Sequence, residues 1–162
     1  MVWIPGFGRY KAQPGNRVGD HAPDFTLKDD GGHDVTLSHE VGERPVVLVF
    51  YPRAGSPICT RQMCSLRDGW GELTARARVF GISYDDVDAI RRFKHDEKLP
   101  FVLLSDSDKS VARKYGVHGT FAPARVTFVI DSSGKIESVI EHIKAGDHAA
   151  QILASLPRDA GA

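Results

Sequence analysis

Two cysteines, Cys59 and Cys64, are the residues of this sequence best suited to do chemistry. Cys59 follows the turn-forming segment 52–58, which leads from an apolar run into a segment with helical spacing. Backbone N–H groups at the start of a helix carry partial positive charge, which stabilises a thiolate and makes a cysteine reactive. Cys64 is the only other cysteine of the chain. The pair favours thiol redox chemistry, and the alternative is an inert cysteine buried where a strand meets a helix.

Metal binding is the second use that cysteines at this spacing could have. Cys59 and Cys64 could form half of a zinc site, but structural zinc usually takes four ligands and the chain has no second cysteine pair. The seven histidines are scattered, without ligand spacing to the cysteines. No nucleotide-binding fingerprint is present. We therefore expect no metal and no cofactor.

Length, composition and charge fit a single globular domain. The chain has 162 residues, 41% of them hydrophobic and 26% charged, which is ordinary for a soluble globular protein. Lys+Arg and Asp+Glu balance at 21 each, so no basic field exists to gather nucleic acid. No apolar run approaches the ~20 residues that a membrane helix needs. We expect neither nucleic acid nor membrane as a partner.

The first residues are rich in proline and glycine and lack the apolar core that a secretory signal needs. We expect an irregular N-terminal arm over residues 1–17 and one domain over residues 18–162. A reducing cytoplasm is the expected location, and nearby cysteines there suggest redox or metal chemistry more than a structural disulfide.

Strand and helix patterns alternate along the rest of the chain. The apolar run 45–51 predicts a central, fully buried strand. Residues 60–76 have apolar side chains at spacings of three and four, which predicts one helix directly after Cys59. Further strands are expected over 24–27, 35–37, 79–83, 101–104, 126–130 and 136–140, and further helices over 86–98, 109–115 and 146–156.

This order predicts a mixed sheet covered by helices on both faces, with a hairpin over 126–140 finishing one edge. Sites in such sheets form beyond the carboxyl ends of the strands. Cys59 follows the strand that ends at Tyr51, so topology and chemistry indicate the same place.

Several motifs in their order resemble the peroxiredoxins. Pro52-x-x-x-Ser56-x-x-Cys59 matches the active-site pattern of that family, and Cys59-Thr60-x-x-x-Cys64 resembles its bacterioferritin-comigratory or plant Q-type subgroup. The resemblance covers roughly residues 18–156. The other matching segments are Val18-Gly19-Asp20-x-Ala22-Pro23-Asp24-Phe25, Val47 to Pro52, Gly81-Ile82-Ser83, Leu104-Ser105-Asp106, Tyr115-Gly116-Val117, Arg125-x-Thr127 to Asp131, and Gly134-Lys135-Ile136.

The resemblance implies a thioredoxin-like α/β fold with extra N-terminal strands, and thiol-dependent reduction of hydrogen peroxide or organic hydroperoxides. Cys59 would be the nucleophile, and Ser56 would accept a hydrogen bond from the peroxide. Pro52 would shield the thiolate from water, and Arg125 would stabilise it and the departing oxygen. The implied partners are a peroxide and thioredoxin or a similar dithiol protein, and the expected assembly is a monomer or weak homodimer.

Cys64 is the candidate resolving cysteine, which would convert the sulfenic acid of Cys59 into a disulfide. Five residues of regular helix separate two Cα atoms by ~8.7 Å. A disulfide needs about 4.4–6.8 Å. The first turn or two of the helix must therefore unwind during the cycle.

Two residues depart from the subgroup pattern. Ile58 stands where glycine is usual, and a β-branched residue does not easily adopt positive φ. Gln62 stands where glutamate is usual, and we expect the change to remove an anchor for Arg125. Both keep an inactive thioredoxin-fold interaction module open as an alternative. A thiol–disulfide oxidoreductase is a further alternative, disfavoured because the chain lacks Cys-x-x-Cys.

Overall fold

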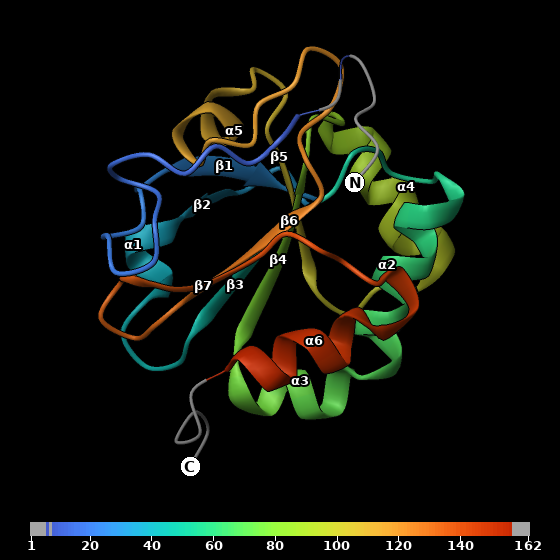
Figure 1. The fold of residues 1–162 in the computed structure, drawn as a ribbon. Helices are drawn as coiled ribbons and strands as arrows, with labels where there is room; N and C mark the ends of the chain where they lie inside the picture. Colours follow the sequence, from blue (N-terminus) through green and yellow to red (C-terminus); the bar gives the residue numbers. More distant parts are fainter. Residues whose placement is uncertain (1–5, 7, 157–162) are drawn as a thin grey trace.

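The computed structural model describes residue 6 and residues 8–156, and for Cys59 the backbone (Figure 1). Its centre is a seven-stranded sheet in the order β2-β1-β5-β4-β3-β6-β7. The strands are β1 (Thr26–Asp29), β2 (Asp34–Thr36), β3 (Val46–Phe50), β4 (Arg78–Ser83), β5 (Val102–Ser105), β6 (Val126–Ile130) and β7 (Ile136–Ile140).

The sheet is mixed, as the sequence predicted. β3 and β5 run parallel to β4, while β6 runs antiparallel to β3 and pairs with β7 in the expected hairpin. Phe50 at the end of β3 lies opposite Val126 at the start of β6. The antiparallel register therefore brings Arg125, just before β6, to the edge where the chain leaves β3 toward Cys59.

Each face of the sheet carries its own apolar core. Along β3, Val46, Leu48 and Phe50 belong to one core, and Val47 and Val49 belong to the other. This alternation is the period of two that a strand imposes, and burial on both faces explains why β3 is apolar throughout.

Helices cover both faces (Figure 1). Residues of α1 and α5 pack into the first core, and residues of α2, α3, α4 and α6 pack into the second. The helices are α1 (Leu37–Glu40), α2 (Pro57–Asp68), α3 (Trp70–Arg76), α4 (Val87–Glu97), α5 (Ser110–Lys114) and α6 (His148–Ser155), with a short 3-10 turn η1 (Ala145–Asp147) before α6.

The helix predicted over 60–76 is wrong in two respects. It begins earlier, because Pro57 fits the first helical position, where its missing N–H costs no hydrogen bond. It is also interrupted at Gly69, which separates α2 from α3. A Cβ at Gly69 would lie 2.9 Å from the Cβ of Ala149 in α6, so the close approach of α6 requires glycine here. The prediction also missed α1, a single turn of four residues.

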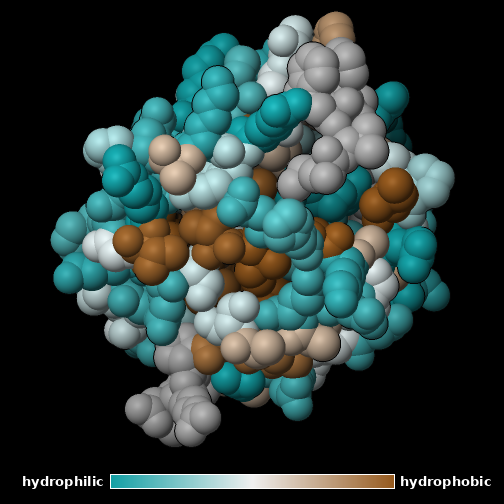
Figure 2. Space-filling view, in the orientation of Figure 1, coloured by the Kyte–Doolittle hydropathy of each residue, from teal (hydrophilic) through white to brown (hydrophobic). Residues whose placement is uncertain are grey.

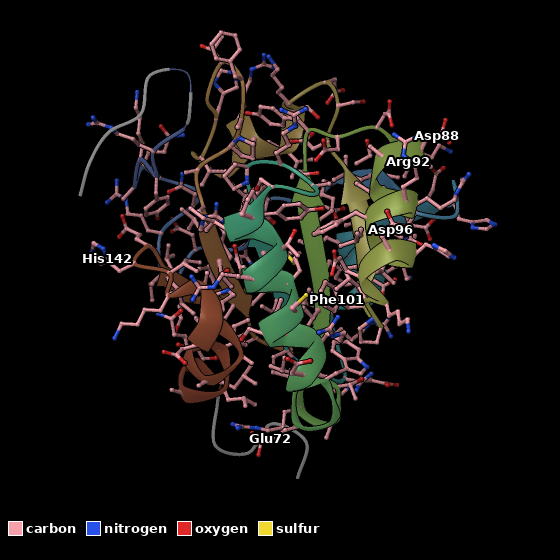
Figure 3. All side chains as sticks on the ribbon, turned by 90° about the vertical axis from the view of Figure 1, so that its right-hand side faces the viewer. Glu72, Asp88, Arg92, Asp96, Phe101 and His142 are labelled. Atoms are coloured by element: carbon pink, nitrogen blue, oxygen red, sulfur yellow. The ribbon has the colours of Figure 1, made fainter. Side chains whose placement is uncertain are left out.

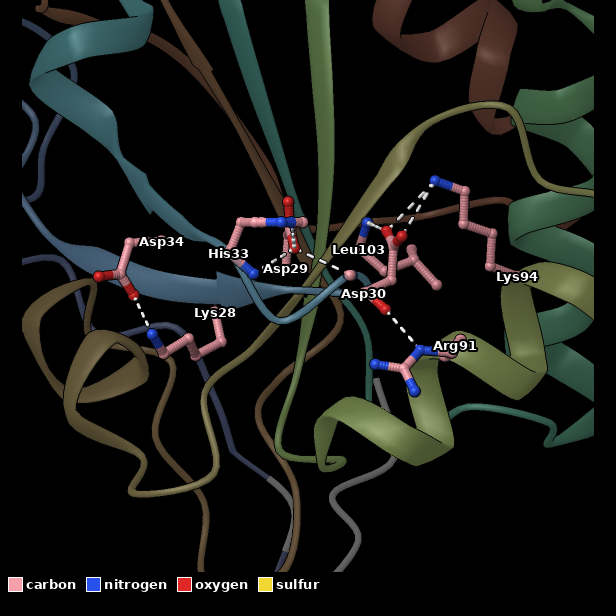
Figure 4. Close-up of polar contacts among 9 residues, drawn as sticks. Lys28, Asp29, Asp30, His33, Asp34, Arg91, Lys94 and Leu103 are labelled. Atoms are coloured by element: carbon pink, nitrogen blue, oxygen red, sulfur yellow. Dashed lines mark hydrogen bonds and ion pairs between the residues drawn. The ribbon is translucent and has the colours of Figure 1, made fainter.

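The β1–β2 hairpin is fixed to α4 through Asp30 (Figure 4). The Asp30 carboxylate accepts hydrogen bonds from Lys94 Nζ at 3.2 Å and from the backbone N–H of Leu103 at 3.0 Å. Arg91 Nε donates to the main-chain oxygen of Asp30 at 2.9 Å. Since both Arg91 and Lys94 belong to α4, these contacts hold that helix against the sheet.

Residues 8–17 contain no strand or helix and lie against the body of the domain. The Tyr10 ring meets Phe128 edge-on at 5.7 Å, and Gly8 N–H donates to the Ala122 carbonyl at 2.9 Å. Residues 1–5 and 7 of the expected arm lie outside the described residues.

The surface in Figure 2 is largely hydrophilic, with apolar groups gathered near the β6–β7 hairpin. This agrees with the incomplete burial of Val139 and Ile140 on the edge strand β7. Within the described part of the chain, no helix combines the length and apolar character needed to cross a membrane.

Candidate active site around Cys59

The loop that leads to Cys59 is tied to the end of β4. The N–H of Ala54 donates to Asp85 Oδ2 at 2.7 Å, and Ser83 Oγ donates to the same oxygen at 2.8 Å. Gly55 has a φ of +81°, a conformation that side chains disfavour. One carboxylate thus fixes the loop between β3 and α2 to the neighbouring strand.

Cys59 is the third residue of α2. Ser56 is the N-cap, and its main-chain oxygen accepts the first helical hydrogen bond, from the Thr60 N–H at 2.8 Å. The N–H groups of Ile58 and Cys59 therefore lie in the first turn, where a helix provides no partner of its own and its dipole favours negative charge. Cys59 is thus the third residue of the helix, whereas the sequence predicted a helix that begins directly after it.

Ile58 does not carry the strain that the sequence suggested. It lies in the first turn of α2, where the backbone is helical and needs no positive φ. Its side chain is 57% exposed. The expected backbone conflict is therefore absent.

Arg125 is brought to α2 by Gln62. Arg125 Nη1 donates to Gln62 Oε1 at 2.6 Å. Gln62 follows Cys59 by three residues on the same helix, so the two positions share one face of α2. The expected loss of the arginine's anchor is wrong, because the glutamine oxygen accepts the bond in place of a carboxylate.

Gln62 is fully buried, and its Nε2 has no hydrogen-bond partner among the described residues. A buried unmatched donor costs free energy, typically about 1–3 kcal/mol. The site therefore holds Arg125 with a neutral group that is itself imperfectly satisfied.

Pro52 and Ser56 lie on the segment between β3 and α2, and Ser56 is the N-cap of that helix. Ser56 Oγ donates to the main-chain oxygen of Arg53 at 3.2 Å. Because a hydroxyl that donates one bond still has two lone pairs, Ser56 can accept a hydrogen bond from a substrate. Pro52 is partly buried directly after Tyr51, which is wholly buried.

Cys64 lies farther along α2, partly buried, as a free thiol. Its Sγ donates to Glu97 Oε2, the last residue of α4, at 3.6 Å. Burial raises the pKa of the Cys64 thiol, the Arg67 cation lowers it, and the hydrogen bond and charge of Glu97 raise it, for a net shift upward. At rest Cys64 is therefore a neutral thiol.

His148 is a buried residue near the site that sequence reasoning did not single out. Its Nε2 lies 2.8 Å from Thr127 Oγ1, and its Nδ1 lies 3.0 Å from Gln151 Oε1. Burial lowers the pKa of His148 to about 4, so it is neutral at pH 7. The bond to Thr127 fixes the start of α6 to β6, two residues beyond Arg125.

Sequence reasoning missed Asp85 and Glu97 as well. Asp85 reaches the loop before Cys59 and Glu97 reaches the cysteine helix, both from distant parts of the chain, and only the tertiary fold reveals such partners. Among the residues that the structure describes, no group of three His, Cys, Asp or Glu could hold a metal ion.

A thioredoxin-like sheet with a cysteine in the first turn of a helix, and an arginine held one turn away, defines a thiol enzyme. Comparison with known proteins gives the family. The AhpC/TSA family matches residues 18–139, and the chain belongs to that family.

Relatives and solved structures place the chain in one branch of it. The chain is 42% identical over 141 residues to peroxiredoxin Bcp of Escherichia coli K12, covering 82% of this chain and 90% of the relative. The crystal structure of peroxidoxin BcpB from Mycobacterium tuberculosis has a TM-score of 0.79 and 38% identity, covering 85% of this chain and 94% of that one.

A third similar protein is the Xanthomonas campestris bacterioferritin comigratory protein, from a structural study of its alkyl peroxide reduction activity. It has a TM-score of 0.71 and 25% identity, covering 81% of this chain and 88% of that one. The predicted fold and the resemblance to bacterioferritin-comigratory and Q-type peroxiredoxins are both confirmed.

Proposed function

We propose that the protein is a peroxidase that reduces hydrogen peroxide and organic hydroperoxides with Cys59 as its nucleophile. The observation that carries the proposal is the 2.6 Å bond by which Gln62 holds Arg125 one helical turn from Cys59. A free thiol of ordinary pKa is only about 3% thiolate at pH 7. A helix start and a guanidinium together favour the ionised form.

In the first step, the Cys59 thiolate attacks one peroxide oxygen and the O–O bond breaks. The sulfur becomes a sulfenic acid, and the other oxygen leaves as water or an alcohol after taking up a proton. Arg125 stabilises the charge that develops on the departing oxygen. Ser56 accepts a hydrogen bond from the peroxide hydroxyl and orients it, and Pro52 limits the access of water to the sulfur.

In the second step, Cys64 condenses with the sulfenic acid to form a disulfide and release water. Both cysteines belong to α2, so the first turns of that helix must open to bring them together. The disulfide is then reduced by thioredoxin or a similar dithiol protein. A cycle of this kind suits a reducing compartment such as the cytoplasm, and a monomer or weak homodimer is sufficient for it.

The experiment is peroxide consumption with a dithiol-protein reductant, using hydrogen peroxide and an alkyl hydroperoxide. Cys59→Ser should abolish turnover while the far-UV spectrum and the thermal unfolding midpoint stay unchanged. Cys64→Ser should consume the first equivalent of peroxide and then stall. Substantial turnover by Cys59→Ser would remove the peroxidase assignment.

The same assay separates the alternatives. A thiol–disulfide oxidoreductase would reduce a protein disulfide but leave peroxide untouched, and an inactive interaction module would do neither. The fit of Ile58 and Gln62 in the site removes the two sequence arguments for the inactive module. An active peroxidase is therefore the better account.

A further inference from the structure

Among the described residues, Glu97 is the one residue of α4 that forms hydrogen bonds to the cysteine helix α2. Its carboxylate accepts from Cys64 Sγ at 3.6 Å, and its main-chain oxygen accepts from Arg67 Nη1 at 2.7 Å. Figure 3 shows α2 and α4 side by side, and both pack into the same core on one face of the sheet. The resting position of Cys64 is thus set by α4.

α4 is a firm support for this contact. Asp30 binds two of its residues, and Phe93 on its inner face is only 5% exposed. Asp86 caps its first turn by accepting from the Ala89 N–H at 2.8 Å. Glu97 therefore stays in place when α2 moves.

The two hydrogen bonds to Glu97 respond differently when the first turns of α2 unwind. Arg67 holds the last turn of α2 to the backbone of α4, a bond that unwinding of the first turns leaves intact. Cys64 lies one turn earlier, and its bond to the Glu97 carboxylate must break before its sulfur can reach Cys59. The carboxylate thus opposes the movement that disulfide formation needs.

Charged groups face the Cys64 sulfur from two helices. Arg67 on α2 lowers the pKa of the thiol, whereas Glu97 on α4 and Asp68 on α2 raise it. A neutral thiol donates a hydrogen bond to the Glu97 carboxylate, whereas a thiolate would be repelled by it. The contact is therefore specific for the protonated form of Cys64.

We propose that Glu97 is a positioning residue that retains Cys64 as a neutral thiol at the α2–α4 contact until the first turns of α2 unwind. The proposal rests on the proposed peroxidase cycle with Cys64 as the resolving cysteine. Leaving Glu97 frees Cys64 from the carboxylate, so the thiol ionises more readily in the open form. Cys64 then attacks the Cys59 sulfenic acid, the S–O bond breaks as the S–S bond forms, and the thiol proton leaves with the hydroxyl as water.

This arrangement sets the lifetime of the sulfenic acid. While Cys64 is retained by Glu97, a second peroxide molecule can oxidise Cys59 further to the sulfinic acid, which does not return to the cycle without a dedicated repair enzyme. Glu97 therefore keeps the resolving thiol of Cys64 protonated, but it also lengthens the time during which the Cys59 sulfenic acid can be oxidised further.

The first test isolates the contact from catalysis. In a Cys59→Ser background Cys64 is the only thiol of the chain, and its alkylation by iodoacetamide is followed across pH 6–10. Glu97→Gln keeps the shape and removes the charge. We expect severalfold faster alkylation near pH 8 and a pH profile moved to lower pH.

The matched control is Asp96→Asn, which removes the same charge one residue earlier from an exposed side chain (Figure 3). It should behave as the parent. The proposal is overturned if Glu97→Gln alkylates at the same rate and with the same profile as Asp96→Asn.

The second test uses the chain with both cysteines in a single turnover with one equivalent of hydrogen peroxide. Glu97→Gln should leave the first, peroxide-dependent phase unchanged, accelerate disulfide closure severalfold, and yield less sulfinic acid under excess peroxide. Closure that is unchanged or slower would overturn the proposal. Absence of the first phase in the parent would instead contradict the proposed peroxidase function. The alkylation test would still report on the Cys64–Glu97 contact, because it does not involve peroxide.

Discussion

Gln62 Oε1 and Arg125 Nη1 lie 2.6 Å apart, and this single bond joins the cysteine helix α2 to strand β6 at the active edge of the sheet. A neutral amide holds the arginine without cancelling its positive charge. In the proposed peroxide step, the full charge of the guanidinium would thus remain available to the Cys59 thiolate and to the departing oxygen. Unwinding of α2 would break the bond and release the arginine.

We expect Arg125→Ala to slow the peroxide step about 10²-fold or more, the usual effect of removing a group that stabilises developing charge. The thiolate absorbance of Cys59 should also appear at higher pH, because its nearby cation is gone. A Cys64→Ser background leaves one thiol to titrate. Arg92→Ala, on the outer side of α4 (Figure 3), is the control and should change neither quantity. An unaltered rate in Arg125→Ala would take this arginine out of the site.

Asp85→Ala should loosen the loop that precedes Cys59, because the Ala54 N–H loses an acceptor 2.7 Å away. We expect kcat/KM for peroxide to fall about tenfold, an effect of roughly 1.4 kcal/mol on the reaction barrier. Asp85→Asn keeps one acceptor oxygen and should recover most of the activity. If alanine and asparagine behave alike, the hydrogen bond does not position the loop.

Acidification should destabilise the protein through His148. Its pKa is about 4 when folded and 6.5 ordinarily, so the folded state binds its proton less tightly than the unfolded state. The contribution of His148 to the free energy of unfolding is fully present above pH 6.5. It decreases as the pH falls toward 4 and is constant below that, and the total loss from this group is about 3 kcal/mol.

The measurement is urea unfolding of the parent and of His148→Gln at several pH values between 7.5 and 4. Asp106, whose pKa burial raises to about 6, contributes in the opposite direction over much of the same range. The difference between the two proteins cancels that contribution and isolates His148. A difference that is independent of pH would show that His148 does not titrate as its burial implies.

Oxidation should open the first half of α2. Met63 and Gln62 are fully buried, so the amides of residues 60–63 should be protected in the reduced protein and exchange faster once the Cys59–Cys64 disulfide forms. β3, with five buried residues, should stay protected in both forms. Mass spectrometry under non-reducing conditions should find the disulfide within one chain. A disulfide between the Cys59 residues of two chains, with α2 undisturbed, would contradict unwinding.

The sequence predicted the sheet well because apolar runs and alternation are local signals. β6 and β7 have the predicted bounds, and β3 differs by one residue at each end. The start of α2 was misplaced although Ser56-Pro57 is a good N-cap and first-turn pair. The resemblance to the active-site motif indicates a helix that begins at Cys59, whereas the capping pair indicates one that begins at Pro57, and the capping pair is correct.

The partners of the site residues could not be predicted in the same way. Gln62 was expected to lose Arg125, since the charge of the usual glutamate suggested that an ion pair was needed. The hydrogen bond depends on one oxygen at the right place, and glutamine has it. Asp85 bonds to Ala54 of the loop and Glu97 bonds to Cys64 of the helix, across 31 and 33 residues of sequence. No motif near either residue indicates these contacts.

The contact between Gly69 and Ala149 has a consequence for how this chain can vary. A Cβ at position 69 would lie 2.9 Å from the Ala149 Cβ, and glycine has no side chain that could become smaller to make room for a larger residue at position 149. A larger residue at position 149 therefore has no compensating substitution at position 69, whereas alanine at position 69 would require glycine at position 149. In a library of randomised variants selected for survival under peroxide, position 69 should return glycine, or alanine only together with glycine at position 149, and position 149 should return only the smallest residues. The junction of α2, α3 and α6 would then be among the least variable parts of the protein, although it takes no part in the reaction.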